Sequence, residues 1–260
     1  MKRVLVTGSN GQLGLTLQDL APDYPEMKFY FTDKDTLDVT RPEEVTRVFA
    51  EIKPDYCINC AAYTQVDQAE KEPEAAYELN VRAIDNLVSA CKESNTILLH
   101  LSTDYVFDGT KEEGYRPYDT PNPINVYGKT KLEGERFIQE KLEHYYIVRA
   151  SWLYSKLYGH NFYKTILTKA KAGEPLIVTD QQRGCPTDAD NLAKYLLELI
   201  ASGSTQFGIK HFTDGEAMTW YDFAEKILKD TGYRDKTDLQ RGENYRTFAA
   251  RPRNSVLING

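Results

Sequence analysis

The stretch Lys2-Arg-Val-Leu-Val-Thr-Gly8-Ser-Asn-Gly11-Gln-Leu-Gly14 decides the fold predicted for this chain of 260 residues. Its apolar, β-branched first half is typical of a buried strand, and Leu13, Leu17 and Leu20 follow at the spacing of one helical face. The glycines between them permit a tight turn, a close approach of backbone N–H groups to a pyrophosphate, and contact between helix and strand. The helix N-terminus adds a partial positive charge. The predicted cofactor contacts of this turn are Gly8, Asn10, Gly11, Gln12, Leu13 and Gly14.

Strand-like and helical stretches alternate along the rest of the chain. Apolar runs predict strands at 28–32, 56–62, 96–102 and 146–150. Helical spacing or capping residues predict helices that start at 40–43, 186–188 and 219–222 or span 84–91 and 127–141, and the Gly- and Pro-rich stretch 107–125 predicts a long loop. Near-continuous apolar strands indicate a parallel sheet that is covered on both faces. The predicted fold class is α/β, a doubly wound parallel sheet of the Rossmann type with a smaller, discontinuous C-terminal substrate lobe.

This pattern also predicts a division into two lobes. Residues 1–150 are expected to form the dinucleotide-binding domain, rejoined by about 184–204. Residues from about 151–183 and 205–260 are expected to form the substrate-binding lobe.

Composition excludes several classes of partner. The formal net charge is −7, from 32 Lys and Arg against 39 Asp and Glu, which argues against nucleic acid or an anionic membrane as the main partner. No apolar run approaches the roughly 18–20 residues of a membrane span, and the first residues do not resemble a signal peptide, so we expect a cytoplasmic location. The pair Cys57-x-x-Cys60 has no second pair, so buried thiols are expected and no metal site is predicted.

A carboxylate follows the second predicted strand. Asp33 lies 19 residues after Gly14, where it can accept hydrogen bonds from the adenosine ribose of a bound dinucleotide. It would repel a 2′-phosphate, but Lys34 beside it and Arg3 at the base of the first strand leave NADPH possible as well as NADH. Asp38 and Val39 are candidates for the wall of the adenine site.

A tyrosine and a lysine begin the helix predicted over 127–141. Tyr127 and Lys131 are four residues apart and therefore lie on one helical face. An ammonium near a phenol favours the phenolate, so we expect the lysine to lower the pKa of the tyrosine from its free value of about 10. After a dinucleotide-binding turn, this pattern indicates a catalytic pair that exchanges protons.

Five motifs carry a resemblance to a known family. They are Gly8-Ser-Asn-Gly-Gln-Leu-Gly14, Asn59-Cys-Ala-Ala-Tyr-Thr64, Ser102-Thr-Asp-Tyr-Val-Phe107, Tyr127-Gly-Lys-Thr-Lys131 and Ala150-Ser-Trp-Leu-Tyr154. The chain resembles the dTDP-4-dehydrorhamnose reductase family of the extended short-chain dehydrogenase/reductases, from residue 2 to about Leu257. In that family, relatives continue beyond this point with a further helix.

The resemblance implies an activity and its residues. The expected reaction is reduction by NADPH or NADH of the C4 ketone of a nucleotide-linked 6-deoxy-4-keto sugar, with dTDP-4-dehydro-L-rhamnose giving dTDP-L-rhamnose. A monomer or weak homodimer is expected. Thr103, Tyr127 and Lys131 match the catalytic trio. The matching cofactor-lining residues are Ala61, Ala62 and Thr64, and Asn80 matches a helix asparagine that supports the fold.

Contacts with the sugar nucleotide are expected from further residues. Tyr105 and Trp152 offer flat faces to a deoxysugar ring. Asn161 could reach the sugar or the phosphates, Arg183 or Arg251 could pair with the diphosphate, and Asp104 lies between the candidate residues Thr103 and Tyr105. The segment 180–187 departs from the family pattern at Gln181 and Arg183, which could alter the sugar or nucleotide preference. His100 lies inside the strand predicted at 96–102 and is expected to be a core residue.

Three other functions occur among proteins with similar motifs. Dehydratases of the superfamily resemble Thr-Asp-Glu where this chain has Thr103-Asp104-Tyr105, and a phenol without a lysine partner is a poor base, so the dehydratase is disfavoured. A non-catalytic nucleotide-binding regulatory subunit, as in the methionine adenosyltransferase β-subunit group, stays open although Tyr127 and Lys131 argue against it. A reductase for another 4-keto-deoxysugar nucleotide also stays open.

Overall fold

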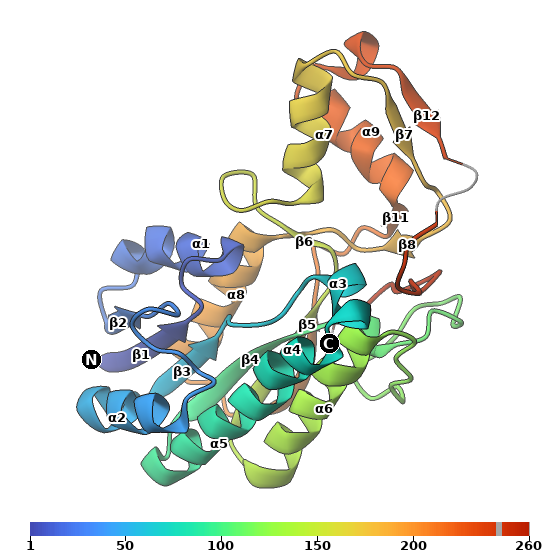
Figure 1. Ribbon diagram of the computed structural model, residues 1–260. Coiled ribbons are helices and arrows are strands. Elements are labelled where there is room, and N and C mark those ends of the chain that lie inside the picture. Colours follow the sequence, from blue (N-terminus) through green and yellow to red (C-terminus); the bar gives the residue numbers. More distant parts are fainter. Residues whose placement is uncertain (243–245, 260) are drawn as a thin grey trace.

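A computed structural model describes residues 1–242 and 246–259 of the chain. Its centre is a sheet of six parallel strands in the order β10-β5-β4-β3-β1-β2 (Figure 1). The strands are β1 (Lys2–Thr7), β2 (Met27–Phe31), β3 (Tyr56–Asn59), β4 (Ile97–Thr103), β5 (Tyr145–Ala150) and β10 (Gly208–Phe212). The order reverses direction at β1, as in a doubly wound fold. The predicted fold class is confirmed.

Helices cover both faces of this sheet (Figure 1). One face packs against α1 (Gln12–Leu20) and α8 (Ala189–Ala201), and the other packs against α2 (Pro42–Ile52), α5 (Ala83–Ser94) and α6 (Val126–Lys141). The side chain of Leu5 packs on the face covered by α2, α5 and α6, whereas its neighbours Val4 and Val6 pack on the face covered by α1 and α8. This alternation explains why the three consecutive residues Val4, Leu5 and Val6 are all apolar. Within the described residues, no helix combines the length and the apolar character needed to cross a membrane.

Short helical segments complete this part of the chain. They are α3 (Val66–Lys71), α4 (Pro73–Tyr77), a π-helical turn over Glu78–Arg82, and 3₁₀ turns at Ala21–Asp23 and Asp104–Val106.

A second lobe has its own core (Figure 1). It contains α7 (Phe162–Lys171), α9 (Trp220–Asp230), a 3₁₀ turn at Arg234–Lys236, and β7 (Leu176–Val178) paired with β12 (Leu239–Arg241). Two small pairs link it to the main sheet, β6 (Leu153–Tyr154) with β9 (Thr187–Asp188) and β8 (Arg183–Gly184) with β11 (Met218–Thr219). Between these elements the chain returns to the main sheet, which extends past residue 204 because β10 pairs with β5.

The start of α2 differs from the prediction. Thr40 was expected to cap this helix, but the helix begins at Pro42 with Arg41 at the N-cap and without a side-chain cap. A proline at the first helical position fixes this start, because its missing N–H would have no partner there. The Thr40 hydroxyl instead donates to Asp38 at 2.7 Å.

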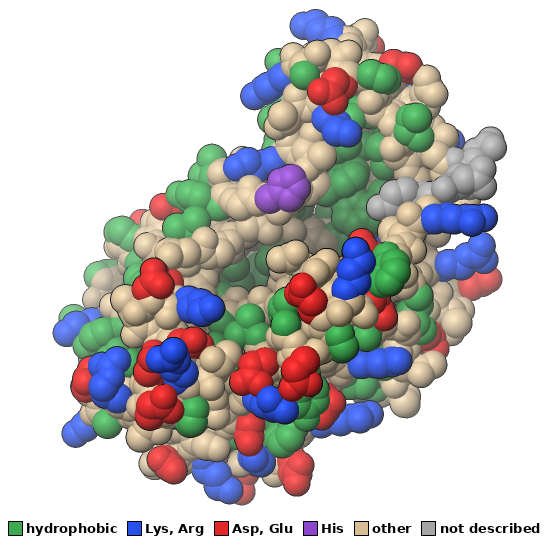
Figure 2. Space-filling model, viewed as in Figure 1, with side chains coloured by type: hydrophobic (Ala, Val, Ile, Leu, Met, Phe, Trp, Pro, Cys, Tyr) green, Lys and Arg blue, Asp and Glu red, His purple; other side chains and the backbone are tan. Residues whose placement is uncertain are grey.

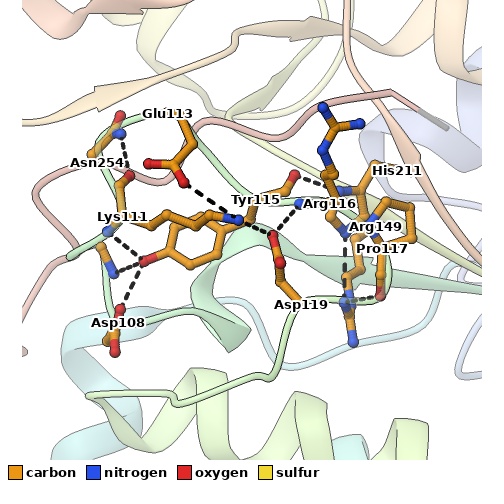
Figure 3. A network of polar contacts seen from close by, with 11 residues as sticks. Asp108, Lys111, Glu113, Tyr115, Arg116, Pro117, Asp119, Arg149, His211 and Asn254 are labelled. Atoms are coloured by element: carbon orange, nitrogen blue, oxygen red, sulfur yellow. Dashed lines mark hydrogen bonds and ion pairs between the residues drawn. The ribbon is translucent and has the colours of Figure 1, made fainter.

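The predicted loop over 107–125 is held in place by a polar network (Figure 3). The Tyr115 hydroxyl donates to Asp108 at 2.7 Å and accepts from the backbone N–H of Gly109 at 2.9 Å. The Tyr115 carbonyl contacts the ring of His211 on β10 at 3.1 Å, and Arg149 on β5 lies beside that ring. The network therefore ties the loop to the sheet edge next to the site described below.

Candidate functional site

Two joined cavities lie at the carboxyl ends of the strands, where ligands bind in doubly wound folds. One, of about 530 Å³, is lined by the loops after β1, β2 and β3. The other, of about 410 Å³, lies between the main sheet and the second lobe. Cys60 and Ala62 line both. Figure 2 shows the surface hollowed between the lobe and the larger part of the molecule, with hydrophobic side chains within the hollow.

The glycine turn has the geometry of an anion site. Gly8 has a φ of +63°, and a Cβ there would lie 2.6 Å from the backbone nitrogen of Ala61. Gly11 is the N-cap of α1, whose first turn has no acidic residue and no side-chain cap. The first N–H groups of α1 therefore remain available to a phosphate.

The residues of this turn that are predicted to bind the cofactor do not all line the same cavity. Gly8 and Gly11 line the larger cavity, and Gln12 and Leu13 line the smaller one. Gly14 packs on Ser9, where a Cβ would lie 2.5 Å from the Cα atom.

Asp33 lines the larger cavity with Lys34, Asp38 and Val39. Its carboxylate accepts from the Thr36 hydroxyl at 2.8 Å and from the Asn10 amide at 2.6 Å. These hydrogen bonds, those from Thr36 first, lower the pKa of Asp33, so the group is an anion at neutral pH.

Arg3 does not reach this cavity. It lies at the amino end of β1, lines a separate cavity and pairs with Asp55 at 3.2 Å. The expectation that Arg3 helps to bind NADPH is wrong, since the larger cavity lies at the opposite end of the strand.

Thr103, Tyr127 and Lys131 meet in the smaller cavity, with Ala62 and Thr64 in the same lining. Thr103 ends β4, and the other two lie in the first turns of α6. Asn125 caps that helix, because its side-chain oxygen accepts from the Gly128 N–H at 2.7 Å. The structure thus brings the predicted trio together.

Burial, more than pairing, sets the charge of these groups. Burial raises the pKa of Tyr127 to about 12, while a hydrogen bond with Thr103 opposes the rise. Burial also lowers the pKa of Lys131 to about 8. The expected lowering of the tyrosine pKa by the lysine is therefore wrong for the protein without ligands, because burial favours the uncharged form of both groups.

A buried carboxylate adjoins the trio. Asp104 is 2% exposed and accepts hydrogen bonds from Thr103 at 3.1 Å, Ser151 at 3.2 Å and Ser255. Burial raises its pKa to about 6, and these hydroxyls limit the rise. The Thr103 hydroxyl is thus held between a carboxylate and the phenol of Tyr127.

Aromatic side chains form part of the wall of the smaller cavity. Trp152 lines the cavity and stacks on Trp220 with a ring-centroid distance of 3.5 Å. Trp152 has a φ of +49°, and a Cβ on Gly184 would lie 2.5 Å from its indole. Tyr105 meets Tyr127 edge to face at 5.9 Å.

Sequence reasoning missed part of this wall. Trp220 follows the Thr219 capping box, which the sequence did predict, but nothing local shows that the indole turns toward the cavity. The other lining residues of the second lobe that were missed are Tyr154, His160, Phe162 and Phe223.

Of three further residues predicted to bind the substrate, one lines the smaller cavity and two do not. Asn161 lines the cavity, and its amide donates to Gln12 at 2.7 Å and to the Ser155 carbonyl at 2.8 Å. Arg183 is exposed on β8 and does not line the cavity. Arg251 also lies outside the lining, where it pairs with Asp67 at 2.8 Å and lies over the Tyr105 ring.

The chain is similar to known proteins along its whole length. The family model of the RmlD substrate binding domain matches residues 1–260. A dTDP-4-dehydrorhamnose reductase of Aggregatibacter actinomycetemcomitans is 38% identical, over 99% of this chain and 90% of the relative. The spore coat polysaccharide biosynthesis protein SpsK of Bacillus subtilis is 34% identical, over 99% of this chain and 89% of the relative.

A solved structure agrees with these relatives. The crystal structure of dTDP-4-dehydrorhamnose reductase from Bacillus anthracis in complex with NADP has a TM-score of 0.95 and 40% identity, and the match covers 100% of this chain and 92% of that chain. Since the family model spans the whole chain and these relatives are more than one third identical over most of their length, the chain belongs to the RmlD family, the dTDP-4-dehydrorhamnose reductases of the extended short-chain dehydrogenase/reductase superfamily.

Proposed function

We propose that this protein uses NADPH or NADH to reduce the C4 ketone of a nucleotide-linked 6-deoxy-4-keto sugar, and that dTDP-4-dehydro-L-rhamnose is its substrate. The observation that carries the proposal is the meeting of Thr103, Tyr127 and Lys131 in a cavity that continues into the glycine turn. The names of the relatives from Aggregatibacter and Bacillus anthracis support the choice of substrate.

The residues present fit a dinucleotide. Gly8, Gly11 and the first turn of α1 would hold the pyrophosphate. The turn requires glycine at position 8, because a Cβ there would strike the backbone of Ala61. Asp33 would accept from the adenosine ribose, and Asp38, Val39, Ala61 and Ala62 would line the site beside it. When bound, NAD(P)H supplies the hydride.

Tyr127 is the proton donor in this proposal. Its raised pKa keeps the phenol protonated at neutral pH until the oxygen of the ketone takes the proton. When substrate is bound, the Thr103 hydroxyl, which donates to Asp104 in the protein without ligands, would turn to donate a second hydrogen bond to the same oxygen and so stabilise its negative charge. Lys131 contacts the nicotinamide ribose and counters the charge that is left on the tyrosine.

The second lobe and its links are proposed to bind the sugar nucleotide. Trp152 offers a flat face to the deoxysugar, and Asp104, Tyr105 and Asn161 lie in the same lining. Arg251 has a buried Nη1 with no hydrogen-bond partner among the described residues, which suits it to a diphosphate oxygen. The Arg183 side chain would have to move to reach the substrate, because it is exposed on β8 outside the cavity lining. We also propose that the chain divides into its two lobes at about residue 150.

The test is a panel of nucleotide 4-keto sugars given to the purified protein with each cofactor. Loss of the reduced nicotinamide absorbance with the dTDP-linked rhamnose precursor, and a rhamnose product by NMR, would support the proposal. Oxidation with another sugar alone would favour a different deoxysugar reductase, a candidate raised by the similarity to SpsK. Cofactor binding without any oxidation would overturn the enzymatic function in favour of a regulatory subunit.

A further inference from the structure

His100 lies below the candidate site, at the centre of a hydrogen-bond chain. The residue belongs to β4 and is 0% exposed. Its Nδ1 atom lies 3.0 Å from Nδ2 of Asn59, and its Nε2 atom lies 3.2 Å from Nζ of Lys131. Both ring nitrogens are therefore in contact with side-chain nitrogens, which is possible only if the protons are distributed in a particular way.

The orientation of the Asn59 amide follows from its other partners. Its Oδ1 atom lies 3.2 Å from the backbone nitrogen of Ala61, which can only donate, and 2.6 Å from the Thr7 hydroxyl. The side-chain oxygen must face these donors, so the NH₂ group faces His100. An NH₂ group can only donate, and Nδ1 of His100 must accept.

A neutral imidazole that accepts at Nδ1 carries its proton on Nε2. That N–H faces Nζ of Lys131, which also donates to the Leu101 carbonyl at 2.7 Å. An ammonium has no lone pair, so only the uncharged amine of Lys131 can accept from the histidine.

We propose that His100 is a positioning residue for Lys131: Asn59 holds its proton on Nε2, and this N–H donates to the lysine nitrogen and favours the uncharged amine. The inference concerns the protein without ligands, and only its consequence for turnover rests on the role of Lys131 proposed above.

The other groups around Lys131 do not reverse this preference. Cys60, after β3, is half-buried, and its desolvation raises the pKa of its thiol, so the thiol is neutral. Glu135 on α6 raises the lysine pKa from a distance, but its carboxylate already pairs with Arg149 at 2.6 Å. Burial, and then the lysine charge, lower the pKa of His100 well below its ordinary value, so the imidazole is neutral as well.

The consequence is a lysine that can change charge near neutral pH. A side chain with a pKa of about 8 can give up and regain a proton during turnover, which an exposed lysine with its ordinary value near 10.5 does not do. His100, which the sequence predicts to be a core residue, is buried as predicted and would set this property of its neighbour.

The test begins with the wild-type protein without cofactor or substrate. The ¹⁵N chemical shifts of the His100 ring report its tautomer, and the ¹³Cε and ¹⁵Nζ shifts of Lys131 report its titration. We expect the Nε2–H tautomer together with a lysine pKa at least one unit below the ordinary value, a tenfold change in its proton affinity. An Nδ1–H tautomer would overturn the proposal without the need for any variant.

The variant Asn59→Asp reverses the donor at one end of the chain. A carboxylate oxygen accepts from Nδ1–H, which leaves Nε2 as an acceptor for the Lys131 ammonium. We expect the tautomer to switch and the lysine pKa to rise by about one unit or more. A switched tautomer with an unchanged lysine titration would contradict the proposal, and if the variant does not fold, the wild-type measurement still decides it.

His211→Gln is the matched control. His211 is the other buried histidine of the sheet, and it contacts Arg149 and the Tyr115 carbonyl rather than the lysine (Figure 3). Glutamine can accept from the arginine and donate to the carbonyl, so the titration of Lys131 should not move. Since these measurements need no substrate, they remain valid if no sugar in the panel is reduced, and the two proposals can fail separately.

Discussion

At the scale of single residues, Tyr127 and Lys131 show which part of the chemistry the sequence could predict. Their four-residue spacing correctly predicts that both side chains lie on one helical face, and both line one cavity. It could not predict that burial would raise the pKa of Tyr127 and lower the pKa of Lys131, because burial depends on β3 and β4, which are distant in sequence. The cavity position of Trp220 was missed, and the cofactor role of Arg3 was wrongly predicted, for the same reason. The surroundings of both side chains come from segments far along the chain.

Replacing the phenol tests the proton donor. Tyr127→Phe keeps the ring that meets Tyr105 but removes the proton, so we expect kcat to fall by about 10²–10⁴-fold while the cofactor Kd stays constant. Steady-state kinetics and fluorescence titration of the cofactor measure the two quantities. Turnover near the wild-type rate would remove Tyr127 from the mechanism.

The Asp33 carboxylate bears on the choice of cofactor. An anion in this cavity repels a 2′-phosphate and can accept from a free ribose, while Lys34 beside it offsets part of the repulsion. Asp33→Ala should shift the ratio of kcat/KM for NADPH over NADH upward by on the order of tenfold. Asp35→Ala is the control, because Asp35 is exposed and does not line the cavity. If both variants leave the ratio unchanged, Asp33 does not contact the ribose.

Asp104 links the site to stability. Its pKa is raised from 3.8 to about 6 on folding, so the folded state binds more protons than the unfolded state between these pH values. Its contribution to stability is fully present below about pH 4 and is lost as the pH rises through 6, by about 2–3 kcal/mol. Urea unfolding at pH 4 and pH 7 should show this loss in the wild type, and Asp104→Asn should show less of it. Equal pH dependence in the two proteins would mean that Asp104 does not titrate as proposed.

At the scale of elements, the strands and most helices follow from apolar periodicity, because burial on one or both faces fixes which residues must be apolar. Sequence reasoning failed where a neighbour outside the element decides its end or its partner. Pro42 starts α2 two residues after the predicted cap. Pairing of β10 with β5 joins residues about 60 positions apart, and no local pattern signals such a contact.

The cap of α6 gives a prediction at this scale. Asn125 accepts from the Gly128 N–H and donates to the Ala250 carbonyl at 2.9 Å, so it fixes the turn that carries Tyr127. Asn125→Ala should lower the free energy of unfolding by about 1–2 kcal/mol and reduce kcat more than it changes cofactor binding. Asn125→Asp, which keeps the cap and loses the second bond, should be the milder change in denaturant unfolding. The reverse order would assign the stability to the Ala250 contact.

At the scale of the whole molecule, the site exists only because two lobes face each other across the cavity, and side-chain hydrogen bonds from α1 join them beside it. Gln12 at the start of α1 accepts from Asn161 at 2.7 Å and from the Ser155 N–H at 3.0 Å, both in the segment that leads to α7. Asn161 keeps other partners, including the Ser155 carbonyl, if this link is lost. Gln12→Ala should therefore cost only about 1–2 kcal/mol of stability.

The same change should affect the sugar more than the cofactor. The Gln12 backbone N–H that faces the phosphate site survives the substitution, so the cofactor Kd should change little. The second lobe loses one of its links to α1, while the contact of Tyr158 with Asp19 remains, so the KM for the sugar nucleotide should rise several-fold while kcat changes less. Kinetics at saturating cofactor and direct cofactor titration separate these effects. A rise in cofactor Kd with an unchanged sugar KM would show that the Gln12 side chain serves the phosphate turn and that the lobes hold their positions without it.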